Sequence, residues 1–143
     1  MKINLICGLI YIFQIYSCGI SHNHRNDVDE NLGHGYYLFK DGAFTCIVYT
    51  EDKIYKGTGS EIVPFEVTKY AVNNDYIIAI SFDNKNNVKN YWIIDTRIRV
   101  KLDNCDFKGC DSLLHSNLSG PIDSISFYEE VKNRHIMLNG FEN

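Results

Sequence analysis

The sequence predicts an α+β fold, an antiparallel β-meander of about five or six strands with one C-terminal helix. Aromatic residues make up 13% of the 143-residue chain and prolines number only two, a composition that favours sheets. Two runs rich in β-formers, Tyr76–Phe82 and Val88–Ile94, flank a polar bend, as in a β-hairpin. One late stretch, from Ser126 onward, has the spacing of an amphipathic helix.

An apolar leader precedes the predicted sheet. Lys2 is the only charged residue before Arg25, and Ile3–Tyr16 is apolar apart from two amides, which is typical of a secretory signal. The run ends at Ile15-Tyr16-Ser17-Cys18. This resembles a bacterial lipobox, whose cysteine is lipidated and becomes the new N-terminus, although Tyr16 is larger than the usual residue there. An ordinary secretory signal and an uncleaved anchor are the alternatives.

The leader divides the chain into three parts. We expect residues 1–17 to be a lipoprotein signal peptide, residues 18–34 a flexible tether, and residues 35–140 a single β-rich domain with the C-terminal helix. Cys18 is the expected lipidation site. Loss of Lys2 makes the net charge more negative than the −4 of the full chain. An acidic chain lacks the basic face that nucleic acid requires, so we expect no nucleic-acid partner.

Short apolar runs predict strands on both sides of the hairpin. Asp41-Gly42 favours a tight turn after the first strand. Pro64 disfavours a central position for the run before it, because proline donates no ladder hydrogen bond. The expected strands are Tyr36–Phe39, Phe44–Thr50, a small edge strand at Ile54-Tyr55, Ile62-Val63, Glu66–Val72, the two hairpin arms and an irregular strand at Arg97–Leu102.

The first hairpin arm alternates between two faces. Tyr76, Ile78, Ile80 and Phe82 form a wholly apolar face, whereas the opposite face is mixed because it includes Ser81. This pattern predicts a central strand with one buried side.

The C-terminal part is expected to be an irregular connection, Asp103–Ser119, followed by the helix. Ser126-Phe127-Tyr128-Glu129 has capping-box spacing at the helix start. The predicted apolar stripe is completed by Val131, His135 and Leu138, and Gly140 is the expected stop.

The cysteines suit a protein outside the cytoplasm. Cys105 and Cys110 are close enough in sequence for a short-range disulfide, and a CxxC redox site is excluded by their spacing. Cys46 lies in an apolar run, which predicts a buried free thiol.

The order of these features resembles a known family. After the lipobox-ended leader come Gly35-Tyr36-Tyr37, Tyr76-Ile77-Ile78-Ala79, Tyr91-Trp92-Ile93-Ile94-Asp95, Gly120-Pro121-Ile122 and a helix carrying Phe127-Tyr128-Glu129-Glu130. Over most of Gly35–Leu138 the chain is similar to small bacterial lipoproteins of the Bacteroidetes type, known only as a domain of unknown function. The stretch from Asp95 to Gly120 is longer here than in that family. The resemblance implies the fold and supplies no catalytic residue.

Candidate metal and catalytic groups are scattered. The densest set of metal-capable side chains lies in and next to the tether, which is better explained as a solvated linker because ordering it is costly. His115 and His135 are expected at the surface or at helix ends, since no serine lies in a GxSxG elbow. We therefore expect no metal site, no cofactor and no enzymatic activity. The tether set comprises His22, His24, Asp27, Asp29, Glu30 and His34.

Two further sets could form a binding surface. Arg97, Arg99 and Lys101 alternate along the chain and could contact an anion or a partner, or could be a solvated sheet edge. The second set is aromatic and could be a ligand platform or part of the core. It comprises Tyr36, Tyr37, Tyr91 and Trp92.

Together, these observations predict a lipid-anchored, non-enzymatic protein-interaction module of the cell envelope, periplasmic or on the outer surface. Its lipid would contact the membrane, and its partner would be an envelope protein or a toxin. The alternative is an envelope protein that binds a small ligand or metal through the tether histidines or the Asp103–Ser119 stretch.

Overall fold

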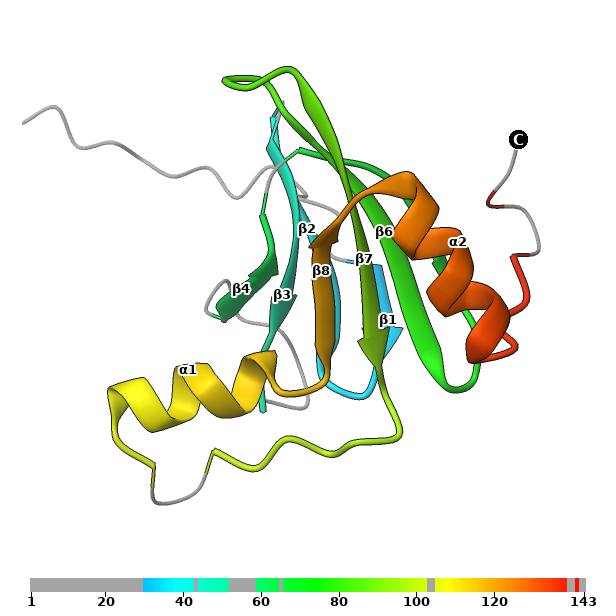
Figure 1. Cartoon of the computed structure of the whole chain (residues 1–143). Coiled ribbons are helices and arrows are strands. Elements are labelled where there is room, and N and C mark those ends of the chain that lie inside the picture. Colours follow the sequence, from blue (N-terminus) through cyan, green and yellow to red (C-terminus); the bar gives the residue numbers. More distant parts are fainter. Residues whose placement is uncertain are drawn as a thin grey trace, which may run out of the picture.

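Two four-stranded antiparallel sheets form the body of the protein (Figure 1). The computed structural model describes residues 30–42, 44–51, 59–64, 66–102, 105–138 and 141. Sheet 1 comprises β1 (Glu30–Gly33), β2 (Tyr36–Asp41), β3 (Phe44–Tyr49) and β4 (Ser60–Val63), and sheet 2 comprises β5 (Val67–Val72), β6 (Tyr76–Asp83), β7 (Val88–Asp95) and β8 (Leu118–Ile122). The helices are α1 (Phe107–His115) and α2 (Ser124–Asn133).

The predicted α+β class is confirmed, but the single meander is wrong. Each strand pairs with its sequence neighbour within a sheet, and the chain changes sheet between β4 and β5. Pro64 lies at this change and cannot donate to the ladder of β4. β4 is an edge strand of sheet 1, as the proline directly after it predicted. The expected strand at Ile54-Tyr55 lies outside the described residues, as does the leader.

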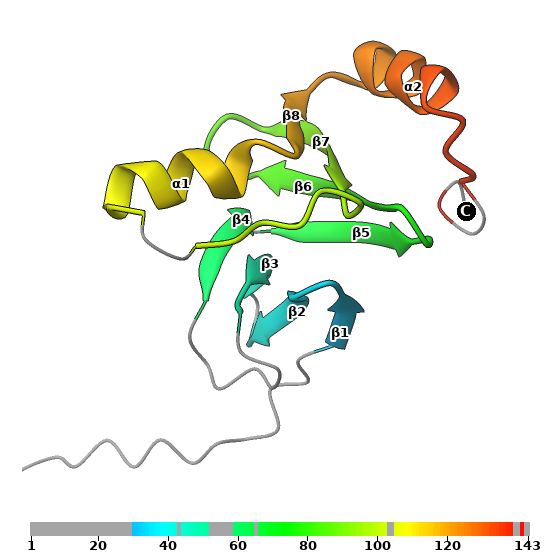
Figure 2. The same ribbon diagram turned by 90° about the horizontal axis from the view of Figure 1, so that it is seen from below.

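The two sheets pack face to face around the main core. Leu38 and Ile47 of sheet 1 and Ile77 and Ile94 of sheet 2 are each 0% exposed within one cluster. Figure 2 shows the two layers, with β5 lying over sheet 1. At that side the Tyr70 hydroxyl of β5 donates a hydrogen bond to the Glu30 carboxylate of β1.

The β6–β7 hairpin has the predicted arms and bend. In the bend, Asp83 Oδ1 accepts hydrogen bonds from the main-chain N–H groups of Lys85 and Asn86, at 2.9 and 3.1 Å. The expectation of one buried face is wrong, because both faces are covered. The mixed face lies between the sheets, where Ser81 accepts a hydrogen bond from Trp92 Nε1 at 2.8 Å and so remains buried without an unpaired hydroxyl.

Helix α2 covers the outer face of sheet 2 (Figure 1). Phe127 and Val131 pack there against Ile78 and Ile93 in a second core cluster. Asp123 is the N-cap, and its carboxylate accepts hydrogen bonds from the N–H groups of the first turn.

The predicted helix bounds therefore need correction. The predicted capping box at Ser126 is wrong. Asp123, three residues before Ser126, is the N-cap, and the helix therefore begins at Ser124. His135 is not part of the apolar stripe, because it follows the helix with a φ of 55° and is exposed. Gly140, the expected stop, lies outside the described residues.

The segment after β7 also differs from expectation. Arg97–Leu102 does not form a strand, and α1 occupies the middle of the supposed irregular connection. Asp106 caps α1 by accepting a hydrogen bond from Gly109 N at 2.8 Å, and Leu114 enters the core between the sheets. In the described part of the chain, no helix has the length and apolarity needed to cross a membrane.

Candidate functional site

A recess of about 500 Å³ opens at one end of the paired sheets. Three segments line it. They are the turn between β1 and β2, the residues that end and follow β3, and the segment that follows β7, residues 96–102, which we call the strap. We call this cavity the recess, and we call Arg97–Lys101 the cationic segment. Figure 1 shows the β1–β2 turn and this strap at the same end of the molecule.

Tyr36, Tyr37 and Tyr49 are the aromatic residues of the described recess lining. The rings of Tyr36 and Tyr49 meet edge to face, with centroids 5.1 Å apart. The Tyr49 hydroxyl donates to the Val100 carbonyl at 3.0 Å and so ties the strap to sheet 1. The Tyr36 hydroxyl accepts from Asn117 Nδ2 at 2.9 Å. Burial raises the pKa of both phenols, so both are neutral at physiological pH.

The β1–β2 turn forms one wall of the recess. Gly33, His34 and Gly35 have consecutive positive φ angles of 88°, 54° and 88°. A Cβ on Gly35 would lie 2.7 Å from the Thr50 carbonyl oxygen, so a side chain there would collide with the end of β3. The Gly35 carbonyl accepts a hydrogen bond from Thr50 N at 2.9 Å, which fixes this wall to sheet 1.

The three basic residues predicted as a partner surface do not act as one group. Arg97 is held by Asp95, with nitrogen–oxygen distances of 2.9 and 2.6 Å, and its guanidinium lies 4.9 Å from the centre of the Tyr76 ring. It faces a second recess of about 360 Å³. Arg99 and Lys101 line the main recess, and no other described residue forms an ion pair or hydrogen bond with their side chains.

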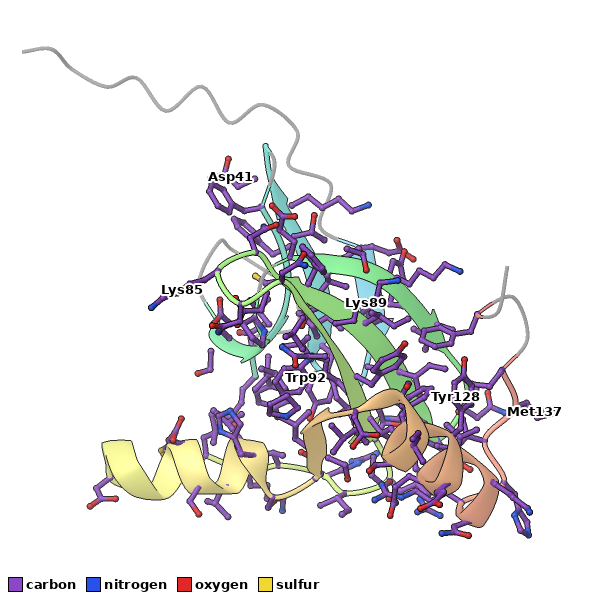
Figure 3. The ribbon with its side chains drawn as sticks, turned by 45° about the horizontal axis from the view of Figure 1, so that its top comes forward. Asp41, Lys85, Lys89, Trp92, Tyr128 and Met137 are labelled. Carbon is purple, nitrogen blue, oxygen red and sulfur yellow. A yellow bond between two sulfur atoms is a disulfide. The ribbon has the colours of Figure 1, made fainter. Side chains whose placement is uncertain are left out.

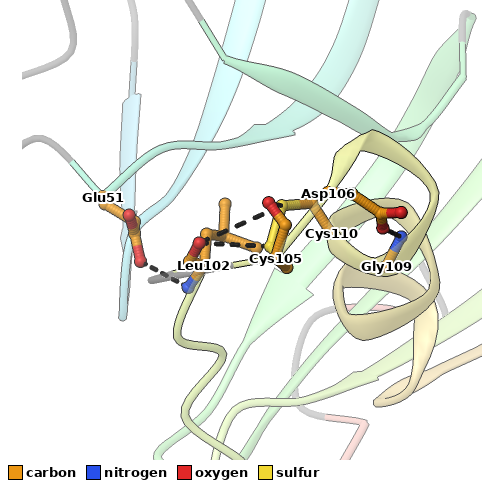
Figure 4. Close-up of a disulfide and its surroundings, with 6 residues drawn as sticks. All are labelled: Glu51, Leu102, Cys105, Asp106, Gly109 and Cys110. Atoms are coloured by element: carbon orange, nitrogen blue, oxygen red, sulfur yellow. Dashed lines mark hydrogen bonds between the residues drawn. A yellow bond between two sulfur atoms is a disulfide. The ribbon is translucent and has the colours of Figure 1, made fainter.

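A disulfide lies where the strap continues into α1 (Figure 4). Cys105 and Cys110, the pair predicted from the sequence, are bonded to each other in the structure. Just before them, the Leu102 N–H donates to Glu51 Oε1 at 2.9 Å. Glu51 is thus the acidic residue of the recess lining, and one of its oxygens is already engaged.

The remaining cysteine is not poised for chemistry. Cys46 is a buried free thiol on β3. Burial, and secondarily the negative charge of Glu61, raises its pKa to about 11. The thiol therefore stays protonated at neutral pH, which disfavours a nucleophilic role.

Two of the three described histidines, His115 and His135, contact main-chain groups, whereas His34 lines the recess. Nδ1 of His115 lies 2.8 Å from the Asp111 carbonyl oxygen, and Nδ1 of His135 lies 2.9 Å from that of Lys132. Across the described residues, no three potential ligands from His, Cys, Asp and Glu gather at one point. His22 and His24 of the tether lie outside those residues.

The four aromatic residues predicted as an alternative platform are dispersed. Trp92 is buried between the sheets, and Tyr91 packs under α2 against Phe127, with ring centroids 5.0 Å apart. Tyr37 is buried on the other face of sheet 1, in a small cluster with Cys46. Core packing therefore accounts for most of this set, and Tyr36 and Tyr37 each contribute both to a core cluster and to the recess lining.

Sequence reasoning missed Tyr49 and the β1–β2 turn as parts of a site. The Gly-His-Gly spacing of that turn was the available signal, because glycines on both sides of one residue indicate an unusual backbone path. Tyr49 gave no signal, since an aromatic residue at the end of a strand is common in any sheet.

The fold and the recess define a small α+β protein with two antiparallel sheets and a basic cavity at one end. The chain belongs to the family described as a protein of unknown function, DUF3997, whose model matches residues 33–110, more than half of the sequence. That match contains the recess lining apart from Asn31. No curated protein and no solved structure matches the chain.

The Asp95–Arg97 pair predicts an acid-dependent loss of stability. The hydrogen bond from Arg97 lowers the pKa of Asp95 below 3.8. The ionised Asp95 carboxylate therefore stabilises the folded protein fully above that pH, and this stabilisation disappears as the pH falls through the folded-state pKa. We expect Asp95→Asn to be less stable than the wild type at pH 7, and this difference to shrink below pH 3.8. Urea unfolding across this range measures it. A difference independent of pH would contradict this assignment.

Proposed function

We propose that the protein is a lipid-anchored component of the cell envelope that binds another protein through the cationic segment and the adjoining recess. The anchor is proposed from the lipobox-like end of the leader at Cys18. The binding role is proposed from the surface chemistry at the recess, as set out below.

The cationic segment has the composition of an interaction surface. Ile98 is 49% exposed, lines both recesses and lies between two arginines. Arginine is one of the residues that provide much of the energy in protein interfaces, especially within well-packed pockets. Isolated exposed aliphatic residues are common, so Ile98 gains significance from its neighbours. The observation that carries the proposal is that exposed Ile98 adjoins Arg99 and Lys101, neither of which has an ion-pair partner within the described part of the chain.

Binding is proposed rather than catalysis because of how the reactive groups are placed. His115 and His135 contact main-chain carbonyls at exposed helix ends, away from the recess. His34 does line the recess, but no serine or cysteine is among the described residues that line it. A general base needs to lie within hydrogen-bond reach of the group it activates. Among the described residues, neither His115 nor His135 forms a hydrogen bond with a serine or cysteine side chain.

Charge reversal tests the proposed surface. We expect the full-length, detergent-solubilised protein to retain a specific protein from its own membranes, and Arg99→Glu/Lys101→Glu to lose it because the surface potential changes sign. The matched control is Lys85→Glu/Lys89→Glu, at the far end of the β6–β7 hairpin (Figure 3). Quantitative mass spectrometry of the retained proteins measures the difference. Identical recovery by both variants, or no specific recovery by the wild type, would contradict the proposal.

Substitution of the lipobox cysteine tests the anchor separately. We expect Cys18→Ala to abolish incorporation of a fatty-acid label and to release the protein from the membrane fraction, because the acylation site is gone. Cys46→Ala is the control, since that buried thiol is not available for acylation. Labelling and membrane association that survive in Cys18→Ala would rule out the lipoprotein assignment.

A second candidate function is small-ligand binding, and the size of the recess favours it. Small-molecule sites commonly enclose about 300–1,000 Å³, a range that includes the recess. The metal-binding form of this alternative depends on His22 and His24. Titration of the full chain with Zn²⁺ and Cu²⁺ separates it from protein binding, because tight binding lost in His22→Ala/His24→Ala would favour the metal.

A further inference from the structure

We propose that the recess binds an acidic peptide segment of the partner, with side-chain carboxylates against Arg99 and Lys101. This inference rests on the proposed function and specifies the chemistry of what is bound. It uses the placement of the two basic side chains, the apolar lining and the fixed walls of the recess.

The charge of the recess favours an anionic occupant. Arg99 and Lys101 both line it, and within the described residues neither has an ion-pair partner. Glu51 is the acidic residue among the described residues of the lining, so the two basic side chains leave an excess of one positive charge there. Arg97 differs, because Asp95 neutralises it outside this recess. The protein has a net charge of −4, so this excess of positive charge is local and is not a property of the whole surface.

The dimensions and lining favour a peptide over a free inorganic anion. A volume of about 500 Å³ far exceeds one phosphate or carboxylate group. Tyr49, Ile98 and Val100 add apolar surface beside the basic groups. An extended peptide presents alternate side chains on one side, so two acidic residues separated by one other can point together. The same i, i+2 separation relates Arg99 and Lys101.

The walls of the recess are already fixed in the free protein. Thr50 N bonds to the Gly35 carbonyl, the Tyr49 hydroxyl bonds to the Val100 carbonyl, and Leu102 N bonds to Glu51. Further along the chain, the disulfide joins Cys105 to Cys110 in the first turn of α1. Binding to a preorganised site loses less conformational entropy, so even a short segment can bind measurably.

Peptide titration tests the inference. The probe is acetyl-Leu-Glu-Leu-Glu-amide, and its neutral match is acetyl-Leu-Gln-Leu-Gln-amide. We expect calorimetry on the full-length protein to show binding of the acidic peptide that is at least about tenfold tighter than that of the neutral peptide and weakens with salt. Arg99→Gln/Lys101→Gln should lose at least about tenfold in affinity, or about 1.4 kcal/mol. Lys85→Gln/Lys89→Gln should bind like the wild type.

Several results would overturn the inference. Equal affinity for the two peptides would exclude carboxylate recognition, and unchanged affinity in Arg99→Gln/Lys101→Gln would exclude this recess. Inorganic phosphate binding as tightly as the acidic peptide would exclude a peptide site. If charge reversal abolishes partner capture while the acidic peptide does not bind, the peptide chemistry is wrong and the proposed function survives. If neither experiment gives binding, both fail.

Discussion

Sheet 2 is apolar on both faces, and the arrangement of the other elements follows from covering it. Ile77 and Ile94 point to one side, Ile78 and Ile93 to the other, and all four are 0–1% exposed. Each such burial is worth about 1.5–3 kcal/mol, so leaving either face in water would remove a large share of the net stability. Sheet 1 covers the first face and α2 covers the second, as the separate core clusters show.

Burial on both sides favours partners for the polar groups that remain inside, although Asn117 Oδ1 has none among the described residues. Ser81 and Trp92 satisfy each other between β6 and β7. At the recess end, Asn117 donates through one amide nitrogen to the Tyr36 hydroxyl and to the Asp95 carbonyl, so it links sheet 1 to the end of β7. This buried amide therefore fixes sheet 1 to the end of β7, where the strap begins.

The recess follows from the path of the chain after β7. The strap passes sheet 1 before it reaches α1, and Tyr49 and Glu51 engage its Val100 carbonyl and Leu102 N–H. These bonds replace those of a strand, which explains why the expected sheet extension at Arg97–Leu102 does not form. Without a neighbouring strand, Arg99 and Lys101 are left beside the opening.

Local patterns in the sequence were sufficient for the hairpin, the edge position of β4, and the buried thiol at Cys46. They were insufficient where long-range contacts decide the outcome. Ser81 made one face of β6 look solvent-exposed, because its partner Trp92 is apparent only once the strands pair. Gly109 has a low helix propensity, so α1 was not expected, and Leu114 is the residue that the described part of α1 contributes to the core between the sheets.

The same limit applied to the site. The alternation of Arg97, Arg99 and Lys101 correctly drew attention to this segment, but charge alone could not separate them. Asp95 forms an ion pair with Arg97, which lies only two positions away in the chain, so the sequence can suggest this contact. The location of Arg99 and Lys101 beside Tyr49 depends on packing between residues about fifty positions apart, which no local pattern encodes.

Site-specific photo-crosslinking in living cells tests the central claim, that the cationic segment and recess are the contact surface, most directly. A photoreactive residue would replace Ile98 in one variant and Lys85, at the opposite end of the hairpin, in another. We expect a discrete crosslinked product at position 98 that disappears when Arg99 and Lys101 are reversed in charge, and none at position 85. Crosslinking only at position 85, or a product at position 98 indifferent to those charges, would contradict the claim.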